Sequence, residues 1–110
     1  ISEGQIVLFK FPQTDLTSPA LVLRRLPGQH NDWLICMISS NLDQKIPDFD
    51  EVIIPNDLDF KDSGLKVPSL IRIGRLAVVD GDILIGKLGE IDPQRLMRIK
   101  RKLSIWIQGT

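Results

Sequence analysis

The sequence predicts a mainly β domain of the α+β class, in which a small curled β-sheet is closed by one C-terminal α-helix. Before residue 80, short runs rich in Val, Ile, Leu and Phe alternate with Gly, Pro and Asn turn signals. A helix start and an apolar stripe at helical spacing come only after residue 91. A domain of 110 residues buries roughly 60–70% of its unfolded surface, so we expect a single domain over residues 1–110.

Most of the expected strands lie in the first 80 residues. The run at 33–38 is apolar at every position, which predicts a central strand buried on both faces. Residues 69–73 and 75–79 form either two strands or one kinked strand, with Gly74 at the bend. The remaining strands of this part are expected at 5–11, 20–24 and 49–54.

Two connections follow from turn and charge patterns. Residues 58–64 carry mixed charge and end in Ser-Gly, which predicts a short helix or a loop. Asp80 and Gly81 indicate a hairpin turn between strands at 76–79 and 83–85, because both central turn positions need positive φ.

The C-terminal helix has the clearest start signal in the chain. Asp92 can cap free amides, and Pro93 suits the first helical position because it has no amide to lose. We expect basic residues on the outer side of this helix. Its apolar face, expected to pack on the core, consists of Leu96, Ile99, Leu103 and Trp106.

The net charge of zero hides an acidic block at 43–62 and a basic block at 95–102. Either these are two solvated surfaces, or they are two faces with different partners. A sequence pI near 6.8 predicts no general attraction to nucleic acid, so any RNA site has to be local. No apolar run approaches the ~20 residues of a membrane span, and no signal-like start is present, so we expect a cytoplasmic protein.

Cysteine and histidine are too few for several kinds of chemistry. The single cysteine, Cys36, excludes an internal disulfide and a cysteine-rich zinc site. It lies inside an apolar strand, where we expect a buried and inert thiol. His30 is the one histidine, and the acidic residues are scattered over loops, so we expect neither a metal site nor a cofactor. Chemistry built on arginine and hydroxyl groups suits this inventory.

Three sequence segments resemble one known family. They are GQIVLFKFP at 4–12, SPALVL at 18–23 and ISSN at 38–41. In this order and spacing they are similar to the PemK/MazF family of bacterial toxins, small ribonucleases that cut single-stranded RNA. The resemblance implies an SH3-like barrel with a terminal helix, a homodimer, and metal-independent cleavage. It also implies a type II toxin–antitoxin system, whose antitoxin would carry an acidic tail complementary to Arg72 and Lys66 in the same groove as RNA.

The resemblance also places a catalytic pair, and here the chain departs from the family. Ser39 matches the family's hydroxyl residue, whereas Ser18 stands where members carry an Arg of the pair. Arg72 matches an Arg that some members use in the RNA site, although Gly74 replaces the Asp that follows it there. We therefore expect Ser39 and Arg72 to be catalytic, and the activity to be weak. Arg24 and Arg25 are poorer substitutes, because they lie at the far end of their strand.

Further residues are expected to bind RNA in a groove formed by the loop at 12–18, the strand end at 38–41 and Arg72. They are Pro12, Gln13, Thr14, Ser18, Ser40, Asn41, Ser69 and Arg75. Simpler interpretations stay open: the serines could satisfy backbone groups where a strand ends, and Arg72 could be an ordinary outward residue.

Two other functions also stay open. The chain could be a toxin-fold binding protein that has lost its chemistry, since an Arg and an Asp of the family are replaced. It could instead resemble the CcdB toxins, which poison DNA gyrase through a C-terminal tail containing Trp. Trp106 fits that tail faintly, but its place in the apolar stripe favours core packing.

Overall fold

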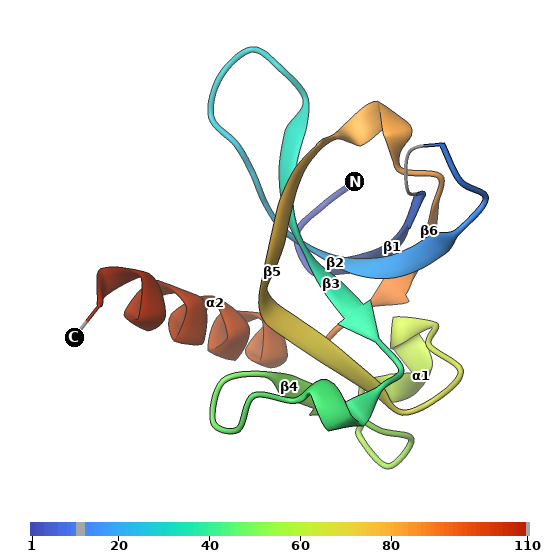
Figure 1. Cartoon of the computed structure of the whole chain (residues 1–110), viewed down its shortest axis with the longest axis vertical. Coiled ribbons are helices and arrows are strands. Elements are labelled where there is room, and N and C mark those ends of the chain that lie inside the picture. The colour runs from blue at the N-terminus through green and yellow to red at the C-terminus, as the bar shows by residue number, and fades with distance from the viewer. Residues whose placement is uncertain (11–12, 110) are drawn as a thin grey trace.

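The computed structural model describes residues 1–10 and 13–109. These residues form a six-stranded sheet of order β4-β5-β3-β2-β1-β6, in which all neighbouring strands are antiparallel. The sheet curls strongly, and the long C-terminal helix lies across it and extends past it (Figure 1). The mainly β class is therefore confirmed. The strands are β1 (Gln5–Lys10), β2 (Thr17–Arg25), β3 (Asp32–Ser39), β4 (Glu51–Ile53), β5 (Ser69–Asp80) and β6 (Gly86–Glu90), and the helices are α1 (Phe60–Ser63) and α2 (Pro93–Gln108).

The apolar strand β3 lies in the middle of the sheet, as its sequence predicts. Successive side chains on β2 and β3 alternate between two buried apolar clusters. Leu21 and Cys36, which face each other across the two strands, belong to the cluster that α2 covers with Ile99. Val22 and Ile35 belong to the other cluster. The buried Cys36 is inert as expected, because burial raises the pKa of its thiol to about 12.

Strand β5 is one strand with a bulge, which confirms the predicted bend at Gly74. Met37 of β3 pairs with Arg72, but its neighbour Cys36 pairs with Leu76. Residues 73–75 therefore have no partner on β3. A side chain at Gly74 would have its Cβ 3.2 Å from Cε2 of Phe49, so the ring sits directly against the bulged backbone.

The predicted hairpin at Asp80-Gly81 is wrong. Asp80 accepts a hydrogen bond from the backbone N–H of Asp82 (2.9 Å) and opens a short 3₁₀ turn. Gly81 does not have positive φ; a Cβ there would lie 2.5 Å from the Asn31 amide nitrogen. After this turn the chain crosses the sheet, and β6 pairs with β1 instead of β5.

Helix α2 begins as predicted, but the end of its apolar face packs differently. Asp92 accepts a hydrogen bond from the backbone N–H of Gln94 (2.7 Å), and Pro93 occupies the first turn. The packing predicted for Trp106 is wrong, because this side chain is 60% exposed. The last turns of α2 extend beyond the sheet (Figure 1), and the Trp106 ring lies tilted by 50° against the Phe49 ring, with ring centroids 6.0 Å apart. None of the described helices is long and apolar enough to cross a membrane.

The acidic and basic blocks are not two separate surfaces, because residues of one block form ion pairs with residues of the other. Arg95 is only 9% exposed, and its guanidinium binds both oxygens of Asp59 (2.8 and 3.2 Å). It also binds Glu51 at 3.0 Å. Arg98 and Lys102 contact the same Glu51 at 2.6 and 3.3 Å. We name this group, with Asp57 added, the α2 ion cluster: Glu51, Asp57, Asp59, Arg95, Arg98 and Lys102.

Ionisation of the α2 ion cluster is favoured despite its burial. Burial opposes the charge on Glu51, but hydrogen bonds and charges of Arg98 and Lys102 outweigh it and hold the pKa of Glu51 below its usual 4.5. Burial likewise opposes the charge on Asp59, and the hydrogen bonds from Arg95 and from the Asp92 N–H bring its pKa below 3.8. The α2 ion cluster thus fastens β4 and the following loop to the helix.

Candidate functional site

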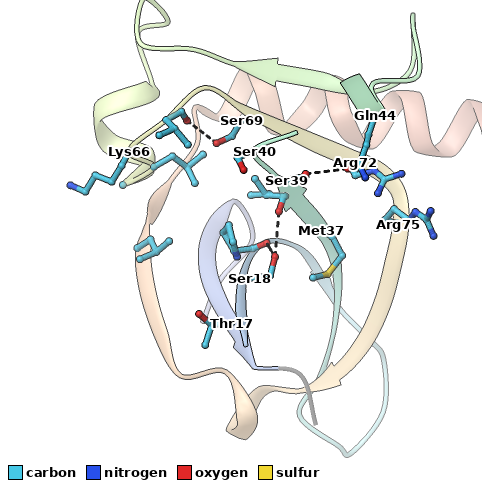
Figure 2. Close-up of a pocket in the computed structure, with 16 residues that line it drawn as sticks. Thr17, Ser18, Met37, Ser39, Ser40, Gln44, Lys66, Ser69, Arg72 and Arg75 are labelled. Atoms are coloured by element: carbon cyan, nitrogen blue, oxygen red, sulfur yellow. Dashed lines mark hydrogen bonds between the residues drawn. The ribbon is translucent and has the colours of Figure 1, made fainter. Parts of the chain in front are cut away.

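The ends of β2 and β3 and the first half of β5 surround a cavity of about 740 Å³. Its lining combines hydroxyl groups with cationic and amide side chains (Figure 2). Several predicted site residues meet here although they come from distant parts of the sequence. The polar lining consists of Thr17, Ser18, Ser39, Ser40, Gln44, Lys66, Ser69, Arg72 and Arg75.

The hydroxyl of Ser39 is held in a defined position at the end of β3. Its Oγ accepts a hydrogen bond from the backbone N–H of Asn41 (3.0 Å) and donates one to Oε1 of Gln44 (3.1 Å). Figure 2 shows this second bond reaching across the strand end. A hydroxyl oxygen has two lone pairs, so one remains for a ligand, and its proton can turn from Gln44 to a better acceptor.

Asn41 does not line the cavity, contrary to the expected groove. Its Oδ1 accepts a hydrogen bond from the Asp43 N–H (3.1 Å) and caps the 3₁₀ turn Leu42–Gln44. That turn brings Gln44 back beside Ser39, so Gln44 is the amide that faces the cavity. Gln44 was not among the residues predicted from the sequence, although the capping residue Asn41, just before the turn, signals the turn that places it.

The three remaining serines all line the cavity but differ in how free they are. Ser18 donates to the carbonyl oxygen of Ile38 (3.3 Å), so it ties β2 to β3. Ser69 is 3% exposed and donates to the carbonyl oxygen of Val67 (2.8 Å). These two hydroxyls satisfy backbone groups, which is the simpler of the two interpretations given above. Ser40 is exposed at the rim.

The residues expected from the 12–18 loop are only partly brought to the site. Gln13 and Thr14 are exposed and do not line the cavity. The Thr14 hydroxyl accepts a hydrogen bond from the Leu16 N–H (3.2 Å), which shapes the turn. Pro12 lies outside the described residues. Arg24 and Arg25 line a different cavity, near Pro27, which agrees with their expected distance from the site.

Arg72 and Arg75 lie on the same side of the bulged strand (Figure 2). Both line the main cavity and also a second hollow of about 540 Å³, which Phe49 and Trp106 share. The Nε of Arg72 is buried and has no hydrogen-bond partner among the described residues. Leaving such a donor unpaired costs about 1–3 kcal/mol, so an anion bound here would recover that energy.

Lys66 also lines the cavity, but Figure 2 shows its ammonium group pointing outward, away from Ser39. Within residues 1–10 and 13–109, no group of three His, Cys, Asp or Glu side chains is arranged to hold a metal ion. The charged side chains that line this cavity are thus two arginines and Lys66, whose ammonium is turned outward, and the other polar side chains of the lining are hydroxyls and the Gln44 amide. Such a lining suits a phosphate-bearing ligand.

Comparisons with known proteins agree with the fold. A family model described as "PemK-like, MazF-like toxin of type II toxin-antitoxin system" matches residues 2–107. A solved structure titled "Endoribonuclease in complex with its cognate antitoxin from Mycobacterial species" superposes with a TM-score of 0.72 at 16% identity, covering 100% of this chain and 97% of that one. At this identity the likeness establishes the fold alone. Curated protein sequences gave no match. The family match spans nearly the whole chain, which therefore belongs to the PemK-like, MazF-like toxins of type II toxin–antitoxin systems.

Proposed function

We propose that this chain is the toxin component of a type II toxin–antitoxin system and that it cuts single-stranded RNA without a metal ion. The observation that carries the proposal is the shared cavity of Ser39 and Arg72, in a member of a toxin family. The structural relative at TM-score 0.72 is itself described as an endoribonuclease. A cytoplasmic location, expected from the sequence, belongs to the same proposal.

In the proposed reaction the RNA's own 2′-hydroxyl attacks the adjacent phosphorus. The 2′-oxygen loses its proton and bonds to phosphorus, the bond from phosphorus to the 5′-oxygen breaks, and that oxygen gains a proton. The products are a 2′,3′-cyclic phosphate and a 5′-hydroxyl end. The guanidinium group of Arg72 holds the phosphate and the negative charge that grows on it. The Ser39 hydroxyl, released from Gln44, donates to a phosphate oxygen.

The activity is expected to be weak, because Ser18 stands where the family resemblance places a cation. Losing one preorganised donor of this kind lowers the rate by about 10²–10³-fold. The Ser18 hydroxyl faces the same cavity, but it is neutral and already bound to the Ile38 carbonyl oxygen.

The proposed partners are an antitoxin chain and a second copy of this chain. The relative with TM-score 0.72 is described in complex with its cognate antitoxin. An acidic antitoxin tail would bind Arg72 and Lys66 and exclude RNA from the cavity. Within the acidic block at 43–62, Glu51, Asp57 and Asp59 are already paired with cations, so these three carboxylates would repel such a tail less than unpaired ones.

A toxin that binds without cutting is the second candidate, and the Ser18 substitution favours it. A gyrase-binding toxin has one observation in its favour, the exposure of Trp106. However, Trp106 belongs to α2 and does not lie in a tail beyond the helix.

The test is incubation of the pure protein with long single-stranded RNA, with and without EDTA, followed by mapping of the cut ends. We expect discrete EDTA-resistant cuts with cyclic phosphate ends. Ser39→Ala and Arg72→Ala should each slow cutting by about 10²-fold or more. Matched controls on α2 are Ser104→Ala and Arg101→Ala, both exposed and outside the cavity.

Cuts that need a divalent metal would contradict the proposal, and so would cuts that both site variants retain. No cutting, together with intact binding of uncut RNA, would favour the binding-only toxin.

A further inference from the structure

The bulge in β5 changes the direction of one arginine. In a regular strand, side chains three positions apart point to opposite faces of the sheet. Arg72 and Arg75 are three apart, yet both line the same two hollows. The reason is the unpaired segment 73–75, which lets β5 turn between Arg72 and Leu76.

Two side chains, those of Asp50 and Phe49, hold this bulge in place. The backbone N–H of Ile73, which has no partner on β3, donates to Oδ1 of Asp50 (3.1 Å). The other oxygen of Asp50 accepts from the Ile46 N–H (3.0 Å), so this carboxylate, only 4% exposed, joins the bulge to the preceding loop. Phe49 covers Gly74, where no larger residue fits without displacing the ring.

The bulge therefore delivers two guanidinium groups that have no carboxylate partner. Neither Arg72 nor Arg75 has an ion pair within residues 1–10 and 13–109, although Arg95, Arg98, Lys100 and Lys102 all do. The buried Nε of Arg72 has no hydrogen-bond partner there either. Planar guanidinium groups bind phosphate oxygens two at a time, which makes a pair of them a strong phosphate site.

We propose that Arg72 and Arg75 form a two-arginine clamp for one backbone phosphate of a single-stranded nucleic acid, and that Asp50 is the positioning residue that keeps the clamp in shape. This proposal rests on the proposed function and adds to it. Arg75 becomes a direct phosphate ligand beside Arg72, and Asp50 acquires a role that no family motif in the sequence indicates.

The surroundings favour a nucleotide over an acidic peptide. The second hollow that both arginines line is walled by the Phe49 ring and the exposed Trp106 ring. Single-stranded nucleic acids are bound by cations along the backbone and by aromatic rings on which bases stack. A nucleotide has both a phosphate and a base, so it matches both parts of the hollow, whereas a carboxylate side chain matches only the arginines.

The experiment measures binding to a single-stranded oligonucleotide whose 2′-hydroxyls are all methylated, so that it cannot be cut. Its affinity is measured by fluorescence anisotropy over a range of salt concentrations. Each lost phosphate contact lowers the slope of log affinity against log salt by about 0.7 for a single strand. Because the two arginines share one phosphate, we expect the slope to decrease by about 0.7 in the double variant, and by about half of that in Arg72→Ala and in Arg75→Ala. Arg101→Ala, an exposed arginine of α2 outside both hollows, should leave the slope unchanged.

The role of Asp50 is tested in the same assay. In Asp50→Asn an amide N–H group faces at least one of the two backbone donors, so the bulge loses its hold and the slope should decrease. The matched control is Asp59→Asn, which alters an equally buried carboxylate of the α2 ion cluster, away from both hollows. We expect lower stability in both variants but a smaller slope only in Asp50→Asn.

An unchanged slope in Arg75→Ala would overturn the clamp, whether or not the protein cuts RNA. Equal slopes in Asp50→Asn and Asp59→Asn would overturn the positioning role. If Arg75→Ala weakens binding of a polyglutamate peptide and not of the oligonucleotide, the ligand is an acidic peptide and the phosphate assignment is wrong. Conversely, a decreased slope in a protein that cuts no RNA would support the clamp and refute only the ribonuclease activity.

Discussion

Arg95 on α2 is buried and Arg72 on β5 is half-buried, and their surroundings are opposite. Arg95 binds carboxylates of Glu51, Asp57 and Asp59 at 2.8–3.3 Å, and its pKa is raised because hydrogen bonds and charges from Asp59 and Glu51 outweigh the opposing effect of burial. Arg72 has a buried Nε with no partner among the described residues. A cation with internal partners contributes to the fold, whereas one without them is available to an anionic ligand.

Both residues are arginines, so the difference in their partners comes from which elements each one faces in the fold. The basic helix faces β4 and the acidic loop after it, so Arg95, Arg98 and Lys102 are neutralised within the chain. The bulged part of β5 faces loop residues that use their polar groups on the backbone, as Asp50 does. The most basic segment of the sequence is therefore the less available one for RNA.

The largest effect is expected from Arg95→Ala. Arg95→Ala leaves the buried Asp59 without its cation and removes one of the three cations that contact Glu51. Breaking a buried ion pair from one side typically costs about 3–5 kcal/mol of unfolding free energy. Denaturant titration measures this loss, and Arg101→Ala should stay within about 0.5 kcal/mol of the parent. The salt slope of oligonucleotide binding should not change. If it decreases as in Arg75→Ala, the contrast between the two arginine groups does not hold.

Ser18→Arg adds a cation beside Arg72 and Arg75 in the cavity, whereas Arg95→Ala removes one from the α2 ion cluster. We expect RNA cutting to become faster, by up to about 10²-fold, because the cavity regains a donor for the phosphate. Single-turnover cleavage rates measure the gain, with Ser104→Arg on α2 as the matched control. An unchanged rate would mean that Arg72 and Arg75 already supply the charge, and the expectation of weak activity would then be wrong.

Acid should reduce the contribution of the α2 ion cluster to stability, and this effect is expected to be the smallest of the three. Glu51 and Asp59 have lowered pKa values in the folded chain, so the unfolded chain binds protons first as the pH falls. Their contribution to stability is complete above their usual values of 4.5 and 3.8 and is lost below them. Melting temperatures measured from pH 7 down to pH 3 should decrease chiefly below about pH 4.5. Glu51→Gln should reduce this acid-dependent decrease, and an identical decrease in that variant would argue against the role of Glu51.

Most of the fold could be predicted because local signals and packing agree. Asp92 and Pro93 start α2 where the sequence places its start, and Gly74 lies in the bulge of β5. The failures come from tertiary structure. Strand β6 has little β propensity, but its backbone pairs with β1. Only a glycine fits at position 89, because a Cβ there would be 2.1 Å from the Asp62 carbonyl oxygen. Trp106 continues the helical period beyond the point where a core exists to receive it.

The candidate site was predictable as a set of strand ends and not as a set of contacts. Ser18, Ser39 and Arg72 line one cavity, because neighbouring antiparallel strands bring their ends together. The choice between Asn41 and Gln44 depends on a 3₁₀ turn, and the direction of Arg75 depends on a hydrogen bond from Ile73 to Asp50. The first is a local turn that the capping residue Asn41 signals, whereas the second joins residues 23 positions apart, so no spacing rule reveals it.

The buried thiol of Cys36 lies on β3, the strand that carries Ser39, so its reactivity reports local opening of that strand. With its pKa raised to about 12 by burial, this thiol is almost entirely protonated near neutral pH, and the apolar cluster around it shields it from reagents. Alkylation of Cys36 can therefore proceed only in molecules whose sheet has opened at β3. The rate of alkylation then counts opening events directly, in the unlabelled wild-type chain, and reveals whether bound nucleic acid or antitoxin closes the central strand against them.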